Sequence, residues 1–204
     1  MSSIIFMISL LGFISLLIRF KSSQSNKQSE ENTKSFWAKE REANSIRKKD
    51  ISNLPYIVVP LDSLPFHDTD DISISRYQDT IRKLAERELL NLSTQTNTDL
   101  KLNYGAANLP FLTNCDTGYT ELIKTLQQWG KALYDSNNIT DAKTVLEFAI
   151  ACKTDIAASY ILLGNIYLSA NNTEQISLLL ESAKEMNSPN KKTAITHLQN
   201  ILQQ

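Results

Sequence analysis

The sequence repeats the ten residues at 129–138, WGKALYDSNN, at 163–172 as LGNIYLSANN. The two copies are offset by 34 residues, and further pairs keep the same offset on either side of the turn-forming asparagines. The pairs are Gly130 and Gly164, Asn137-Asn138 and Asn171-Asn172, Leu146 and Leu180, and Ala149 and Ala183. A fixed period of this length indicates two copies of one helix–turn–helix unit.

Apolar side chains recur at spacings of three and four in both copies, which is typical of amphipathic helices. The first copy carries Leu122, Leu126, Trp129 and Leu133, followed by Ala142, Val145, Leu146, Ala149 and Cys152. The second copy carries Tyr160, Leu163, Gly164 and Tyr167, followed by Ile176, Leu179, Leu180 and Ala183. The spacing predicts helices over residues 120–134, 140–152 and 156–168 and a fourth after Asn172, with Thr140 and Thr173 as N-caps.

This pattern resembles the tetratricopeptide (TPR) repeat family. The matching residues are Tyr160, Leu163-Gly164, Tyr167 and Ala183 in the second copy, and Trp129-Gly130, Ala142, Leu146 and Ala149 in the first. Departures from the family pattern are Leu133 for a Tyr, Ile176 for a small Ala, Leu146 and Leu180 for Phe, and Thr154 and Ser188 for Pro. The resemblance implies a mainly α fold of TPR-like α-hairpins in an α–α superhelix. A generic four-helix bundle with the same stripes is the alternative.

In this family the first helix of each unit lines a groove that takes an extended peptide or a helix. By position in the repeat, the expected partner-binding residues are Lys124, Gln127, Lys131 and Tyr134 from the first copy, and Ile161, Asn165 and Leu168 from the second. Lysines beside an apolar patch suit a protein segment with an acidic group and an apolar anchor. Only Asn165 matches the clamp that grips a C-terminal carboxylate in some members.

The N-terminus contains the apolar run IIFMISLLGFISLLI at residues 4–18. Residues 3–20 can just cross a bilayer, so residues 1–21 are expected to be a transmembrane anchor. A cleaved signal peptide would need a positive charge before the run, and none is present; a buried core helix is the other alternative. Basic residues follow the run, at Arg19, Lys21, Lys27 and Lys34. Because such residues stay on the cytoplasmic side, we expect the N-terminus outside and the C-terminal domain in the cytoplasm of a single-pass protein.

Residues 22–50 are polar and charged, and predict a flexible tether over 22–34 and a juxtamembrane helix from Phe36 to about Lys48. The partly irregular residues 51–118 are expected to cap and connect to the repeats of 119–204. Within the connecting region the sequence predicts an extended segment at 54–60, a helix at about 72–90, and a short strand at 100–104. Carboxylates at Asp68, Asp70 and Asp71 suit the helix N-terminus, and residues 191–202 are expected to form the solvating helix over the last repeat.

The sequence carries no motif for catalysis. The chain has a net charge of −1, and its 86-residue repeat region holds seven Lys and eight acidic residues, which gives nucleic-acid binding no electrostatic support. Neither of its two histidines, His67 and His197, has a nearby catalytic partner in the sequence. The two cysteines, Cys115 and Cys152, are far apart and match no metal-ligand spacing. We therefore expect no enzyme activity, no cofactor and no metal.

The expected function is that of a membrane-anchored scaffold or adaptor that binds a protein partner. The layout also resembles single-pass membrane proteins of Gram-positive anaerobes, a group with no established activity. The resemblance rests on FWAKEREAN at 36–44, PLDSLP at 60–65 and TDLKLNYG at 98–105. The alternatives are an extracytoplasmic envelope-assembly protein and an enzyme with a site in the loops at 61–71 and 98–112.

Overall fold

A computed structural model describes residues 30–203 of the chain. The described residues are mainly helical, as predicted, and they contain no β-strand beyond an isolated bridge between Ile57 and Leu89. They divide into two compact units: residues 30–49 with 97–107, and residues 50–96 with 108–203.

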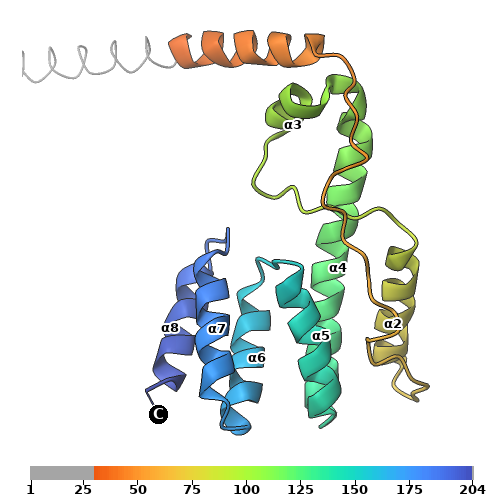
Figure 1. Ribbon diagram of the computed structural model, residues 1–204, viewed down its shortest axis with the longest axis vertical. Helices are drawn as coiled ribbons and strands as arrows, with labels where there is room; N and C mark the ends of the chain where they lie inside the picture. Colours follow the sequence, from red (N-terminus) through yellow and green to blue (C-terminus); the bar gives the residue numbers. More distant parts are fainter. Residues whose placement is uncertain (1–29, 204) are drawn as a thin grey trace, which may run out of the picture. The chain divides into compact units, whose positions relative to one another are not determined.

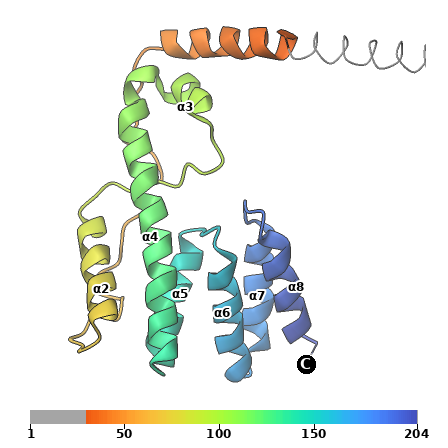
Figure 2. The same cartoon turned by 180° about the vertical axis from the view of Figure 1, so that it is seen from behind.

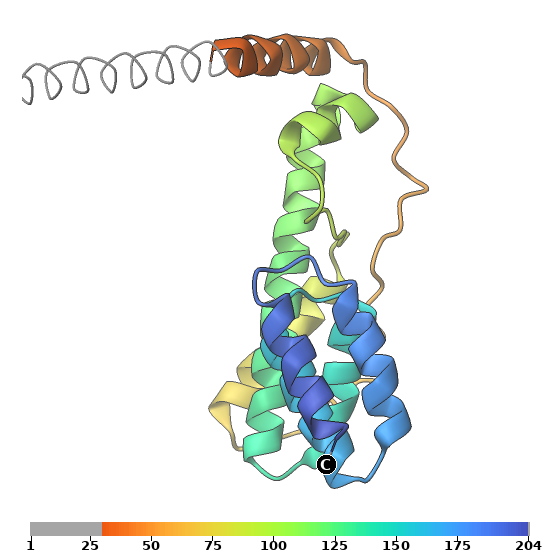
Figure 3. The ribbon, with the colours of Figure 1, turned by 90° about the vertical axis from the view of Figure 1, so that its left-hand side faces the viewer.

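The second unit is a row of helices that lie side by side (Figures 1 and 2). Its helices are α2 (Ile72–Ala85), α4 (Leu109–Asp135), α5 (Ile139–Ala151), α6 (Ala157–Ser169), α7 (Thr173–Lys184) and α8 (Lys191–Ile201). Helix α4 packs on α2 and α5, α6 packs on α5 and α7, and α8 packs on both α6 and α7. Figure 3 shows α7 and α8 next to each other at the end of the row. The helix that the sequence predicts over 191–202 therefore covers the last hairpin.

The repeated asparagine pair forms the same turn twice. Asn137 and Asn171 both have a left-handed backbone, with φ of 63° and 53°. The next residue of each pair donates its N–H back into the preceding helix, Asn138 to the carbonyl of Leu133 and Asn172 to that of Tyr167, each at 2.9 Å. Asparagine tolerates this conformation better than most residues. The 34-residue period of the sequence is therefore also a period of the backbone.

The predicted stripes form the core of the second unit. Leu122, Leu126, Trp129 and Leu133 are fully buried on α4, and Ala142, Val145, Leu146 and Ala149 are fully buried on α5. Gly130 lies so close to α5 that a Cβ there would be 2.8 Å from Cγ of Leu146. Its repeat counterpart Gly164 faces α8 instead, where a Cβ would be 2.5 Å from Cδ2 of Leu198. The glycines allow these close helix contacts.

The predicted N-caps are wrong by one residue or more. Helix α5 begins at Ile139 with Asn138 as its N-cap, and α7 begins at Thr173 with Asn172 as its N-cap. Thr140 and Thr173 are therefore already helical. The side chain of Asn172 accepts from the N–H of Gln175 at 3.2 Å, so the asparagine that closes the turn also caps the next helix.

Helix α4 is much longer than predicted. It spans 27 residues and begins with Pro110 in its first turn, where the missing proline N–H costs nothing. The expected boundary between residues 118 and 119 falls inside this helix, because Leu112, Cys115 and Tyr119 continue its buried stripe. Helix α2 begins at Ile72 as predicted, with Asp71 accepting from the N–H groups of Ser73 and Ile74, but it ends at Ala85 and not near Leu90.

The first unit contains a helix over the described residues 30–45 and α3 (Asn97–Tyr104). The short 3-10 helix η1 (Ala106–Asn108) begins in this unit and ends at the first residue of the next segment of the second unit. The strand predicted at 100–104 is wrong, and so is the expectation that the tether continues to residue 34. The alternation of apolar residues in the sequence does not become an alternation of burial in the structure, because only Leu100 of α3 is buried.

Polar contacts join the two helices of this unit. Glu40 accepts from the hydroxyl of Thr98 at 2.7 Å and also pairs with Lys101, and Lys39 pairs with Asp99 at 2.8 Å. The bonds from Lys101 and Thr98 lower the pKa of Glu40. These partners lie 58 to 61 residues apart in the sequence, so local patterning does not predict them.

Candidate functional site

The predicted groove residues form two stripes on neighbouring helices. On α4, Lys124 and Lys131 are exposed, and Gln127 and Tyr134 are half-buried. On α6, all three predicted residues are half-buried: Ile161, Asn165 and Leu168. Because α4 and α6 contact each other, the structure places the predicted residues on adjoining helices of one unit.

Two of these residues already have partners within the second unit. Lys131 pairs with Asp135 one turn further along α4, with Nζ 2.6 Å from Oδ2. The Oδ1 atom of Asn165 lies 2.8 Å from Nε2 of His197 on α8, a hydrogen bond that requires the ring proton on Nε2. A partner that binds at Lys131 therefore has to compete with an exposed ion pair, which is a weak competitor.

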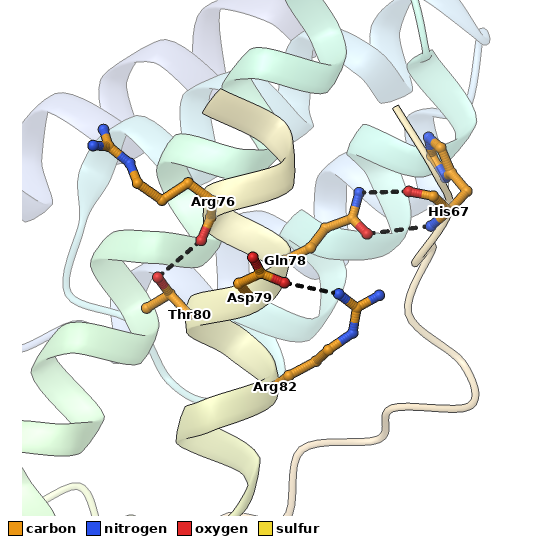
Figure 4. A network of polar contacts seen from close by, with 6 residues as sticks. All are labelled: His67, Arg76, Gln78, Asp79, Thr80 and Arg82. Atoms are coloured by element: carbon orange, nitrogen blue, oxygen red, sulfur yellow. Dashed lines mark hydrogen bonds and ion pairs between the residues drawn. The ribbon is translucent and has the colours of Figure 1, made fainter. Parts of the chain in front are cut away.

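Residues 64–67 of the connecting segment are held between helices. Gln78 of α2 bonds the backbone of His67 at both ends: its amide nitrogen donates to the carbonyl at 3.1 Å, and its oxygen accepts from the N–H at 3.2 Å (Figure 4). The Phe66 ring lies 5.3 Å from the Trp129 ring of α4 and 4.7 Å from the guanidinium carbon of Arg82. On the other side, Nδ1 of His67 lies 3.9 Å from Oδ2 of Asp141 on α5. The chain thus binds its own extended segment between α2 and the first hairpin.

A polar cavity of about 200 Å³ lies where loops meet the ends of α6 and α7. Its lining includes Asn91, Lys153, Asp155, Tyr160 and Glu185. The Tyr160 hydroxyl donates to the carbonyl of Thr154 at 3.2 Å.

Behind this cavity, two side chains reach one backbone carbonyl. The Tyr119 hydroxyl donates to the carbonyl of Lys153 at 2.9 Å, and the Asn91 amide donates to the Tyr119 oxygen at 2.8 Å. Burial raises the pKa of both Tyr119 and Tyr160, so these hydroxyls stay protonated at neutral pH. The network holds the α5–α6 loop, in which Lys153 has a left-handed φ of 57°.

A second hollow, of about 310 Å³, lies between α5 and α7 with α6 as its floor. We call it the α5–α7 groove; its lining residues are Glu147, Ile150, Ala151, Leu163, Tyr167, Gln175, Leu178, Leu179 and Ser182. One of these lining residues, Leu178, is a large apolar side chain that is 57% exposed. The Tyr167 hydroxyl donates to Oε1 of Glu147 at 2.7 Å. Burial and then this hydrogen bond raise the pKa of Tyr167.

The repeat pattern does not predict this groove. The run Leu178-Leu179-Leu180 is a usable signal for it, because a helix that buries one face cannot place three consecutive leucines in its core. Leu179 is buried and Leu180 half-buried, whereas Leu178 is turned away from the core.

The loops named for the alternative enzyme site are divided between the two units. Residues 61–71 and 108–112 belong to the second unit, and residues 98–107 belong to the first. Asp71 of the first loop caps α2. Within residues 30–203, no cluster of three or more His, Cys, Asp or Glu side chains could hold a metal ion.

The predicted membrane anchor at residues 3–20 lies outside the described residues. Over residues 30–203, no helix combines the length and the apolar character that a bilayer span requires. Comparisons of the chain with protein-family models, with curated proteins and with solved structures found no match.

Proposed function

We propose that this chain is a membrane-anchored scaffold or adaptor whose TPR-like helical repeats bind a segment of a protein partner. The observation that carries the proposal is the duplicated hairpin. Its turns share backbone geometry and hydrogen bonds at an offset of 34 residues. Helical repeats of this kind build extended binding surfaces from equivalent positions in successive units.

The proposed binding surface is the pair of stripes on α4 and α6. Lys124 and Lys131 supply positive charge, and Tyr134, Ile161 and Leu168 supply partly exposed apolar surface. This combination suits a partner segment that has an acidic group and one apolar anchor, because aromatic and aliphatic anchors contribute most of the energy and charges contribute orientation.

The proposed anchor is the apolar segment 3–20, with the described domain on the cytoplasmic side. Arg19 and Lys21 directly follow the segment, which favours this orientation. Holding the domain at the membrane would raise the local concentration of a partner that is also there.

Site-specific photocrosslinking in intact cells tests the binding surface. We expect a photoreactive residue in place of Lys131 to give an adduct that disappears when Tyr134→Ala is added. The same residue in place of Lys83, an exposed lysine of α2, is the matched control and should not give this adduct. An adduct at position 131 that survives Tyr134→Ala, or one that forms equally at position 83, would contradict the surface assignment.

Paired reporters fused after Gln204 test the topology. We expect activity from the reporter that works only in the cytoplasm and none from the one that works only outside. The opposite result would support the extracytoplasmic envelope-assembly alternative. Deleting residues 2–21 should release the chain from membranes in alkaline carbonate, and a chain that pellets unchanged would argue against the anchor.

A further inference from the structure

The α5–α7 groove of the second unit has a counterpart one repeat earlier. Subtracting the 34-residue period from its lining residues on α6 and α7 gives residues on α4 and α5. The pairs are Leu163 and Trp129, Tyr167 and Leu133, Gln175 and Asp141, Leu178 and Thr144, Leu179 and Val145, and Ser182 and Phe148. The earlier position is therefore built from the same parts of a hairpin.

The earlier position is occupied by the chain itself. Phe66 lies 5.3 Å from Trp129, the counterpart of Leu163, and His67 lies 3.9 Å from Asp141, the counterpart of Gln175. The segment is extended, and its backbone is held by the side chain of Gln78 on the neighbouring helix. The molecule thus contains an example of a peptide segment bound at this place, with an aromatic ring against the first helix and an imidazole ring beside it.

No described residue fills the groove in the same way one repeat later. Its floor and walls are apolar at Ile150, Leu163 and Leu178, and about 310 Å³ is enough for one large side chain. Glu147 on α5 is the charged residue among those that line the groove. A carboxylate accepts hydrogen bonds and cannot donate them, so it selects N–H groups and cations.

The charge around the groove points to the same kind of ligand. Residues 139–186 contain six Asp or Glu and three Lys, a net charge of −3. On α7, Glu174 and Glu181 are exposed and directly precede the lining residues Gln175 and Ser182, and Glu181 pairs with Lys184 at 2.6 Å. Lys143 lies 3.8 Å from Glu147, and the two side chains are 44% and 43% exposed, so this ion pair is a weak competitor for a bound cation.

We infer that the α5–α7 groove binds an extended segment of a partner protein in which a large aromatic or aliphatic side chain is followed by a Lys or Arg. The anchor side chain lies against Leu163 and Leu178, and the cation lies at Glu147. This surface is separate from the stripes on α4 and α6, so it stands or falls independently of the function proposed above.

Selection from a phage library of random eight-residue peptides tests the inference. The target is the full chain in detergent micelles. We expect enrichment of peptides with a Phe, Trp, Tyr or Leu followed within two positions by Lys or Arg. Leu178→Asp should weaken their binding by about tenfold or more, because the anchor loses an apolar contact and meets a charge. The matched control is Leu61→Asp, which alters another exposed leucine and should leave binding unchanged.

A charge reversal provides a second, independent readout. With Glu147→Lys, the same selection should exchange the basic residue for Asp or Glu and keep the aromatic anchor. Lys131→Glu with Tyr134→Ala should leave the selected peptides bound, since these residues belong to the other surface. The inference is overturned if no peptide is enriched, if the enriched peptides lack the basic residue, or if Leu178→Asp has no larger effect than Leu61→Asp. Circular dichroism checks that each variant is folded.

Discussion

Three residues with side chains have a left-handed backbone in the described chain: Asn137, Lys153 and Asn171. The two asparagines could be predicted as turn residues from the sequence, because their side chains tolerate this conformation. Lys153 could not, because a lysine there pays the usual cost of about 1–2 kcal/mol. Its conformation is supported from far along the chain, by the Tyr119 hydroxyl on its carbonyl.

The turn asparagines give a prediction for stability. Replacing Asn137 by Ala should lower the free energy of unfolding by about 1 kcal/mol, since alanine has the Cβ penalty at positive φ without the polar compensation. Asn137→Gly should keep most of the stability. Urea unfolding followed by circular dichroism measures both variants. Equal stability of Asn137→Ala and the parent chain would mean that the left-handed turn does not limit stability.

At the scale of elements, the sequence predicts well where burial follows a period. Helices α5, α6 and α7 lie where the stripes place them, because each buries one face against the next. The prediction of secondary structure fails where contacts between residues far apart in the sequence determine it. Residues 100–104 alternate in the sequence like a strand, yet they are helical in α3, with Thr98, Asp99 and Lys101 paired to the helix at 30–45.

The start of α4 was missed for a different reason. The turn-forming residues before Pro110 are typical of a loop, but a proline is well tolerated in a first helical turn. The two candidate surfaces also differ in whether the sequence predicts them. The stripes on α4 and α6 follow from the repeat, whereas the α5–α7 groove needs the packing of three helices.

Gly105 gives a prediction at this scale, within the first unit. Its φ is +90°, and a Cβ there would lie 2.3 Å from the carbonyl oxygen of Arg47. Gly105→Ala should therefore separate α3 from residues 46–49. Amide hydrogen exchange measures the effect: the N–H of Lys49, which donates to Tyr104 at 3.0 Å, should exchange faster. The amides of α6 in the second unit are the internal control, and protection of Lys49 at the parent level would contradict the prediction.

At the scale of the whole molecule, the core contains groups that are neutral only while protonated. Burial raises the pKa of the Cys152 thiol from 9.0 to about 12 and raises the pKa of Tyr119, Tyr160 and Tyr167. The unfolded chain loses these protons at a lower pH than the folded chain. The folded state therefore binds more protons above pH 9, and the free energy of unfolding must fall as the pH rises.

Urea unfolding at alkaline pH tests whether the free energy of unfolding falls as the pH rises. We expect the urea midpoint to be highest below pH 9 and to decrease steadily from pH 9 toward pH 12. Cys152 alone contributes a slope of up to about 1.4 kcal/mol per pH unit in that range. Cys152→Ala should make this decrease shallower. The variant is also expected to be less stable at pH 7, but that loss does not change the slope against pH. A slope that does not change in this variant would show that the thiol ionises equally in both states.

Helix α8, at one end of the helical row, affects whether copies of the chain can associate end to end. Helix α8 turns Ala194, Leu198 and Ile201 inward and leaves Lys192, Thr193, Thr196, Gln199 and Asn200 exposed. A hairpin that ended at α7 would present Gly164 and its apolar surroundings to the next molecule, and copies could then stack end to end into a fibre. The polar outer side of α8 offers no such surface. Covering Gly164 with α8 therefore protects this end of the helical row against such end-to-end association.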